Sequence, residues 1–214
     1  MRFSPTAFFM KILALCFLAL NATAFAQVVK IPPRGQVPKE VLLSAQRATQ
    51  RVADAVVRGD LSVPIRLMYP EWKKKQAAKS GGIKKLERSA KKTFEELRAA
   101  GVQLKVMRAE QPYSAFEVDF GLEGGKGVYR KWLVFVPTTS IMSAINHVVS
   151  PPEMIDIRME SYQVAISDKG ALKWTFLDGN QIEAFQLRQL FPFLPRKNED
   201  LGLPRVGGKT IKKR

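Results

Sequence analysis

Hydrophobic positions in the first part of the chain repeat at helical spacing. Pro38 suits the first turn of a helix, and Gly59 suits the position just past a helix end. Between these two residues, apolar side chains recur every three or four positions, which predicts a helix over 38–58 with one buried face. The apolar positions are Val41, Leu42, Ala45, Ala48, Val52, Ala55 and Val56.

Two further helices are predicted downstream. The first is short: Asp60 or Ser62 can cap it, and Pro70 ends it after Tyr69. The second lies within residues 80–101, and its apolar residues fall on an arc of about 80° at 100° per residue. We expect this stripe to be buried and to anchor the core. It consists of Ile83, Leu86, Ala90, Phe94 and Leu97.

After Gly101 the spacing changes from helical to alternating, which is typical of strands. The run at 128–136 is apolar at consecutive positions, so it should form a central strand that is covered on both faces. Residues 138–154 show neither spacing and are expected to be irregular. The whole pattern predicts strands at about residues 102–106, 116–120, 128–136, 155–166 and 172–177, and a short helix at about 181–190.

The N-terminal 26 residues have the pattern of a secretory signal peptide. Lys11 precedes an apolar run over 12–20, and Ala24-Phe25-Ala26 forms a small-x-small ending. A membrane anchor is the main alternative, but the stretch from residue 12 to residue 26 is shorter than the roughly 20 residues of a spanning helix. We therefore expect cleavage near Ala26 and a periplasmic or extracellular protein. The true start could be Met1 or Met10.

The mature chain is then expected to contain an extended lead-in at 27–37, one α+β domain at 38–194 and a flexible basic tail at 195–214. Cleavage removes Cys16, which is the single cysteine, so we expect neither a disulfide nor a thiolate metal site. It also removes two basic residues, and 33 basic residues minus 19 acidic residues leave a net charge of +14.

Much of the positive charge belongs to one predicted helix. Such a cluster can attract anionic glycans, lipid headgroups or nucleic acid, and it is also an ordinary solvated face of a helix. The candidates for polyanion binding are Lys84, Lys85, Arg88, Lys91 and Lys92.

Two segments resemble the NTF2-like (SnoaL-like) superfamily. The first is Ala-Asp-Ala-Val-Val-Arg-Gly-Asp-Leu at 53–61, followed by Leu-Met-Tyr-Pro at 67–70. The second is Lys-Trp-Thr-Phe-Leu-Asp-Gly at 173–179, which is similar to a late core strand of that family. The resemblance covers about residues 38–190. It implies three N-terminal helices packed on a strongly curved antiparallel sheet that forms a cone, with the short C-terminal helix and basic tail as additions.

No pattern in the chain is typical of a known catalytic site. His147 is the single histidine, and a zinc site is not expected without a second histidine or a cysteine. Glu117 and Asp119 alternate with phenylalanines, so they should face water if the phenylalanines face the core. There is neither a Gly-x-Ser-x-Gly elbow nor a phosphate-binding glycine loop. We expect no cofactor and no metal.

Aromatic residues with polar tips are the best candidates for the wall of a pocket. They are Tyr69, Trp72, Trp132, Tyr162 and Trp174. The leading hypothesis is a non-catalytic domain that binds a small apolar ligand or a protein partner in or near the cone. One alternative is an isomerase, dehydratase or cyclase, which would require Asp119, Tyr162 or His147 to point inward. The other alternative is a polyanion-binding envelope protein.

Overall fold

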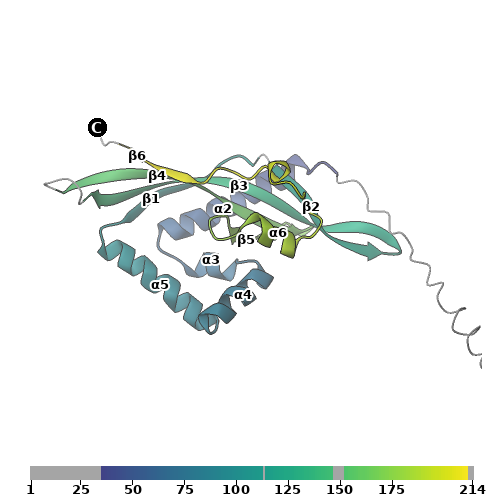
Figure 1. The fold of residues 1–214 in the computed structure, drawn as a ribbon, viewed down its shortest axis with the longest axis horizontal. Helices are drawn as coiled ribbons and strands as arrows, with labels where there is room; N and C mark the ends of the chain where they lie inside the picture. The colour runs from purple at the N-terminus through teal and green to yellow at the C-terminus, as the bar shows by residue number, and fades with distance from the viewer. Residues whose placement is uncertain (1–34, 113, 147–151, 212–214) are drawn as a thin grey trace, which may run out of the picture. The chain divides into compact units, whose positions relative to one another are not determined.

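The computed structural model describes residues 35–112, 114–146 and 152–211. The predicted signal peptide and His147 lie outside them. The helices are α2 (Lys39–Val57), α3 (Ser62–Arg66), α4 (Pro70–Ser80), α5 (Ile83–Ala99) and α6 (Ala184–Leu190). The strands are β1 (Gln103–Ala109), β2 (Ser114–Glu123), β3 (Lys126–Asn146), β4 (Glu153–Asp168), β5 (Thr175–Asp178) and β6 (Gly207–Ile211). The predicted α+β class and the helices-then-strands order are confirmed (Figure 1).

The long antiparallel pair of β3 and β4 forms the centre of the sheet. β2 pairs with the first half of β3, and β1 pairs with its second half. On the opposite edge, β5 and β6 pair with different halves of β4. Six antiparallel strands thus form the sheet within the described residues. The sheet is not strongly curled, which corrects the expectation of strong curvature (Figure 1).

The expectation that residues 138–154 are irregular is wrong, because most of them belong to β3 and β4. One face of this part of β3 carries Thr138, Ser140 and Met142, and the sheet pairs these residues with β1 and β4. Hydroxyl side chains at the inward positions remove the alternation of apolar and polar residues on which the sequence argument depended. The backbone hydrogen bonds form regardless of that pattern.

The two faces of the sheet bury separate hydrophobic clusters. On one face, the α2 residues Val41, Ala45, Ala48 and Val52 pack against Val134, Val136 and Ala165. On the other face, Leu133, Phe135 and Val164 pack against Leu187 of α6 and the residues that follow it. The central run of β3 is therefore covered on both sides, as its continuous apolar pattern predicted. Residues 133–136 are all fully buried.

Glutamine side chains attach α2 to β1. The amide of Gln50 donates to the carbonyl oxygen of Met107 (3.1 Å) and accepts from the N–H of Ala109 (2.8 Å). Gln46 donates to the carbonyl oxygen of Ala109 (3.1 Å). These bonds satisfy backbone groups at the edge of the sheet and fix the position of α2 beside β1.

Helix α4 was missed in the sequence, because Pro70 was interpreted as the end of the preceding helix. Proline is also favoured at the first position of a helix, and Pro70 occupies that position in α4. Just before it, the backbone of Tyr69 donates to Phe176 in β5 (2.9 Å), and Phe176 donates to Leu67 (2.8 Å). The start of α4 is thereby attached to the sheet, and Trp72 in its first turn is buried.

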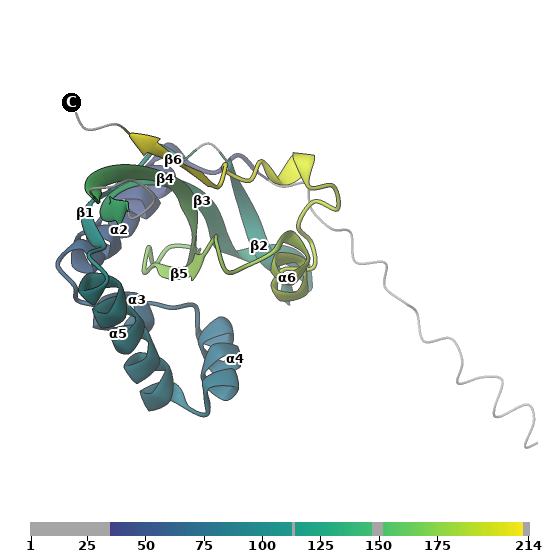
Figure 2. The same ribbon diagram turned by 60° about the vertical axis from the view of Figure 1, so that its left-hand side comes forward.

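Helix α5 forms where it was predicted, but its apolar stripe does not anchor the core. None of its 17 residues, all within the described part of the chain, is buried. Ile83 is 36% exposed and Leu97 is 47% exposed. In Figure 2, α4 and α5 form a V that is joined at Gly81 and Gly82, and α5 runs back toward β1. The helical periodicity was correct, but residues of the stripe line open hollows instead of packing closely against other side chains.

The segment expected to be a flexible basic tail contains regular structure. A 3₁₀ helix at Glu199–Leu201 places Leu201 in the core with no exposed surface. Ser114 donates a hydrogen bond to the carbonyl oxygen of Leu201 (2.6 Å). Farther on, β6 adds an exposed strand beside β4. Glycine and lysine content concealed this strand, since its stability comes from backbone pairing rather than side-chain burial.

Two truncations should separate these contributions. Ending the chain after Val206 removes β6, whose five residues are all exposed, so we expect the free energy of unfolding to change by less than about 1 kcal/mol. Ending it after Arg196 also removes the buried Leu201, and we expect a loss of about 2–5 kcal/mol, as for other large buried aliphatic side chains. Urea denaturation of both variants tests this, and equal midpoints would contradict it.

No helix in the described residues is long and apolar enough to cross a lipid bilayer.

Candidate functional site

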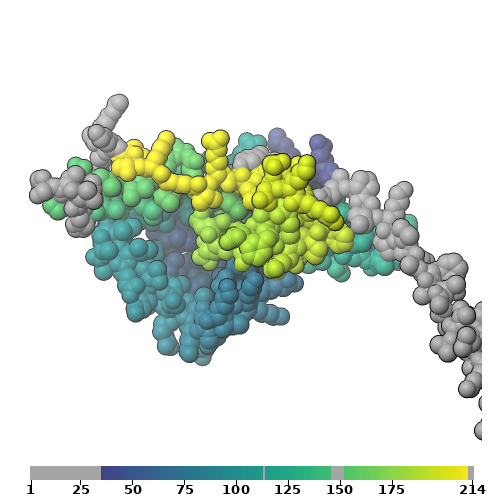
Figure 3. Space-filling model, viewed as in Figure 1, coloured from purple at the N-terminus to yellow at the C-terminus, as the bar shows by residue number. Residues whose placement is uncertain are grey.

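A cavity of about 460 Å³ lies between the helices and one face of the sheet. In Figure 3 a recess is visible between α5 and the residues near β5 and α6. The volume is within the range of small-molecule sites. The wall contributed by the helices and their connections is mostly apolar and includes Val52, Val56, Pro64, Ile65, Met68, Trp72, Gln76, Leu86 and Ala90.

The apolar stripe of α5 therefore has a partial role at this site, because Leu86 and Ala90 line the cavity. Both side chains are half-buried. Methionines at Met68, Met107 and Met142 line it as well. Thioether side chains adapt their shape to different apolar partners, so this wall can accommodate ligands of varied outline.

The sheet contributes a row of polar side chains to the same cavity. Thr138 is opposite Ser161 in the β3–β4 register, and Gln163 is opposite Asp178 in the β4–β5 register. Paired residues project to one face of a sheet, as do residues two apart on a strand. All four of these residues line the cavity. The cavity is thus apolar on the helix side and polar on the sheet side.

Ser161 is the cavity residue whose side chain most clearly lacks a hydrogen bond in the described structure. Its hydroxyl oxygen is buried and has no hydrogen-bond partner among the described residues. A buried hydroxyl without a partner costs about 1–3 kcal/mol, and such groups are uncommon in folded proteins. A ligand atom in the cavity could supply the missing hydrogen bond.

Asp178 is the last residue of β5, and its carboxyl group is half-buried. Burial raises the pKa of Asp178 above its ordinary value, and the hydrogen bond from the Asn180 N–H (3.0 Å) opposes this only in part. The next residue, Gly179, lies flat against the ring of Tyr162, and its N–H donates to the Tyr162 carbonyl oxygen (2.9 Å). The contact between Gly179 and Tyr162 fixes the backbone next to Asp178 and so the position of the Asp178 side chain.

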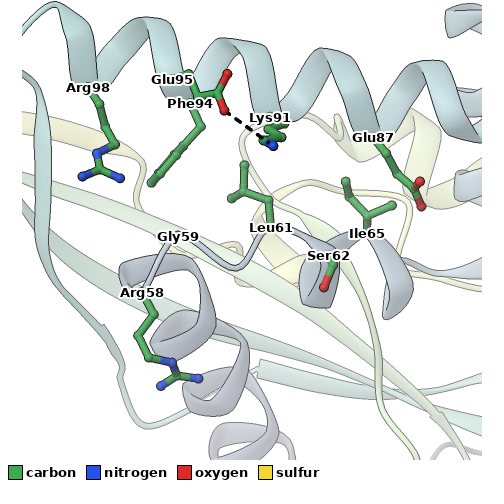
Figure 4. Close-up of a pocket in the computed structure, with 10 residues that line it drawn as sticks. All are labelled: Arg58, Gly59, Leu61, Ser62, Ile65, Glu87, Lys91, Phe94, Glu95 and Arg98. Atoms are coloured by element: carbon green, nitrogen blue, oxygen red, sulfur yellow. Dashed lines mark ion pairs between the residues drawn. The ribbon is translucent and has the colours of Figure 1, made fainter.

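A second hollow, of about 470 Å³, lies on the other side of Ile65 (Figure 4). Phe94 and Leu61 line it, and charged side chains surround them, including the Lys91–Glu95 ion pair (3.8 Å). The Phe94 ring also contacts Gly59 just after α2. Because this hollow has many exposed charged groups and no unsatisfied buried polar atom in the described residues, the first cavity is the better candidate site.

The five predicted pocket-wall aromatics occupy different places. Trp72 lines the cavity. Tyr69 and Tyr162 belong to the hydrophobic cluster that contains Phe135. Trp174 is buried in the other cluster and donates to Ser44 Oγ (3.0 Å), and Trp132 packs at the edge of that cluster beneath the ammonium of Lys169.

The carboxylates considered for catalysis lie in ion pairs away from the cavity. Asp119 contacts Lys131 and Arg130, and Glu117 contacts Lys169. Burial favours a higher pKa for Asp119, but the hydrogen bonds and charges of Lys131 and Arg130 outweigh it and lower the pKa. Asp119 is therefore held as a carboxylate anion in an ion-pair network, which does not suit a proton-accepting role at neutral pH.

The polyanion-binding candidates Lys84, Lys85, Arg88, Lys91 and Lys92 are all exposed on α5. Two of them have acidic neighbours one turn further on, in the pairs Lys91–Glu95 and Lys92–Glu96 (3.6 Å). Exposed pairs of this kind contribute about 0.3–0.5 kcal/mol to a helix. They also reduce the positive charge that the helix presents to a polyanion.

Sequence reasoning missed Ser161, Gln163 and Asp178 as site residues. The sequence signal for Asp178 was the polar residue that directly follows the apolar run of β5, and it was interpreted as part of a turn. Only the register between β4 and β5 brings the three residues to one face.

Comparisons of the chain with protein-family models, curated proteins and solved structures give no significant match. The fold and the cavity define an α+β protein with a mixed polar and apolar pocket between helices and sheet.

Replacing Asp178 with asparagine should change how stability depends on pH. Because the folded pKa of Asp178 is above the unfolded value of 3.8, ionisation favours the unfolded chain as the pH rises through the window between the two pKa values. The asparagine side chain introduced there does not ionise and can keep the hydrogen bond from Asn180. Asp178→Asn should therefore gain stability relative to the wild type as the pH rises above the unfolded pKa of 3.8.

Urea denaturation at several pH values measures this difference. The exposed Asp168 is a matched control, and no such gain is expected for Asp168→Asn. A constant difference between wild type and Asp178→Asn across this range would contradict the burial argument.

Proposed function

We propose that the protein is a non-catalytic binding domain that takes a small, mainly apolar ligand into the cavity between α4, α5 and the sheet. The observation that carries this proposal is the buried Ser161 hydroxyl, which has no hydrogen-bond partner among the described residues and lies in a mostly apolar cavity of about 460 Å³. Ligand sites commonly combine an apolar wall with a few polar groups that fix orientation.

The exposed stripe of α5 supports the same function. Ile83 exposes apolar surface one helical turn from Leu86, which lines the cavity together with Ala90. Exposed apolar surface of this kind is typical of a binding site. A bound apolar molecule would cover part of it and gain about 25 cal/mol for each Å² removed from water.

The resemblance of residues 53–70 and 173–179 to the NTF2-like superfamily is consistent with this proposal. We propose membership of that superfamily, with a flatter sheet than its cone-shaped fold implies. We also propose that the domain acts outside the cytoplasm, after removal of residues 1–26. In each case the support is the sequence pattern itself.

A neutral fluorescent dye can test the cavity as a binding site. N-phenyl-1-naphthylamine should bind and be displaced by 1-decanol. Ala90→Phe places a large ring in the cavity wall, so we expect it to weaken dye binding by at least about tenfold. Ala99→Phe makes the same change at an exposed position of the same helix and should leave binding unchanged.

The proposal fails if the wild type does not bind the dye. It fails equally if Ala90→Phe binds the dye as tightly as Ala99→Phe does. Circular dichroism of both variants should show that the helices remain folded.

A further inference from the structure

We propose that the cavity selects a cationic amphiphile, in which an apolar chain carries a protonated amine that pairs with the carboxylate of Asp178. This inference rests on the proposed function and specifies the chemistry of the ligand. It is based on the charges that line the cavity, on the hydrogen bonds of Asp178 and on the polar residues beside it.

The charge of the cavity is opposite to that of the protein. The chain has 35 basic and 19 acidic residues, so its average field attracts anions. Yet Asp178 is the single ionisable group among the described residues that line the cavity. The lysines of α5 are exposed instead, and none of them lines the cavity in the described structure. A ligand with a negative group would therefore meet a carboxylate and no cation.

Asp178 has unused hydrogen-bonding capacity. Its Oδ1 accepts one hydrogen bond, from the backbone of Asn180. It forms no ion pair within the described residues, although an ionised carboxylate can accept several hydrogen bonds. Burial without a cation disfavours the charged form, and an ammonium group would reverse this penalty by pairing with it.

The ionisable side chain that interacts with Asp178 is a tyrosine. The pKa of Tyr162 is raised chiefly by burial and in addition by the charge of Asp178. Tyr162 therefore remains a neutral phenol at pH 7 and does not compete with a ligand for the carboxylate. No basic side chain among the described residues pairs with Asp178, so the ammonium group of a ligand would supply the missing positive charge.

The residues beside Asp178 can receive the other hydrogens of an amine. An ammonium group has three N–H donors and no acceptor. Ser161 offers a buried hydroxyl oxygen that lacks a partner in the described structure, and Gln163 lies opposite Asp178 in the sheet. Three acceptors on neighbouring positions of one sheet face match the three donors, and the apolar helices enclose the chain.

Three ligands with the same chain test this selectivity: decylamine, 1-decanol and decanoate. Each should be titrated against bound N-phenyl-1-naphthylamine at pH 7, below the concentration at which it aggregates. We expect decylamine to bind at least about tenfold more tightly than decanol, and decanoate to bind most weakly, since a desolvated charge pair strengthens binding.

Asp178→Asn should reduce the preference for decylamine over decanol to less than about twofold, chiefly because decylamine binding weakens. Asp168→Asn removes an exposed carboxylate and should keep the wild-type preference. If decanol does not displace the dye, the proposed function itself fails. If decanol binds but decylamine is no better, or if decanoate binds most tightly, only the inference about the amine is overturned.

Discussion

Replacing Phe135 with alanine is expected to lower the free energy of unfolding by about 3–5 kcal/mol. Phe135 lies on β3 with no exposed surface, and its ring contacts those of Phe116 and Tyr162 at centroid distances of 6.1 Å and 5.9 Å. The substitution removes a large apolar side chain from the centre of one hydrophobic cluster and leaves a cavity among rigid neighbours. Urea denaturation followed by circular dichroism measures the loss.

Phe94→Ala is the matched comparison, because it makes the same chemical change on α5. Phe94 is half-buried and borders hollows on two sides, so we expect a loss of about 1 kcal/mol or less. The sequence pattern alone would have assigned the larger loss to Phe94. If the two variants have similar midpoints, α5 packs against the domain more closely than the structure shows.

Replacing Gly179 with alanine should cost about 2–3 kcal/mol, within the range for overpacked positions. A Cβ atom at this position would lie 2.6 Å from three ring atoms of Tyr162. The backbone cannot easily move away, because the Gly179 N–H donates to the Tyr162 carbonyl oxygen. The ring is itself 3% exposed and has little room to turn.

The same substitution should disturb the neighbouring Asp178 and reduce the preference for decylamine. Gly207→Ala is the control, since a Cβ atom there would have no neighbour within 4 Å. Thermal denaturation of the two variants compares them directly. Equal transition temperatures would show that the Tyr162 ring yields, and the steric argument would then be wrong.

The sequence predicted those elements whose apolar pattern corresponds to burial. The face of α2 that carries Val41, Ala45 and Val52 is buried, and the continuous run in β3 is covered on both sides. Predictions failed where the apolar pattern of the sequence does not match the burial of the side chains. The stripe of α5 has ideal helical spacing but faces hollows, while Thr138 and Ser140 lack an apolar pattern and still lie within a long strand.

The candidate site could be predicted only in small part, for a related reason. Trp72 was identified because a large aromatic residue with a polar tip is a common pocket component. Ser161, Gln163 and Asp178 are ordinary polar residues, separated along the chain and without a motif. Their significance depends on strand register and on the absence of a cation near Asp178 in the described structure, and neither can be obtained from spacing in a single sequence.

The lack of buried side chains on α5 has a consequence for how a guest molecule could reach the cavity. Opening α5 exposes little additional apolar surface, so the free energy of this local opening should be far smaller than that of global unfolding. The sheet and α2, which hold the buried clusters, need not open with it. A ligand can then exchange between the bound and free states many orders of magnitude faster than the domain unfolds, because local opening of α5 gives access to the cavity.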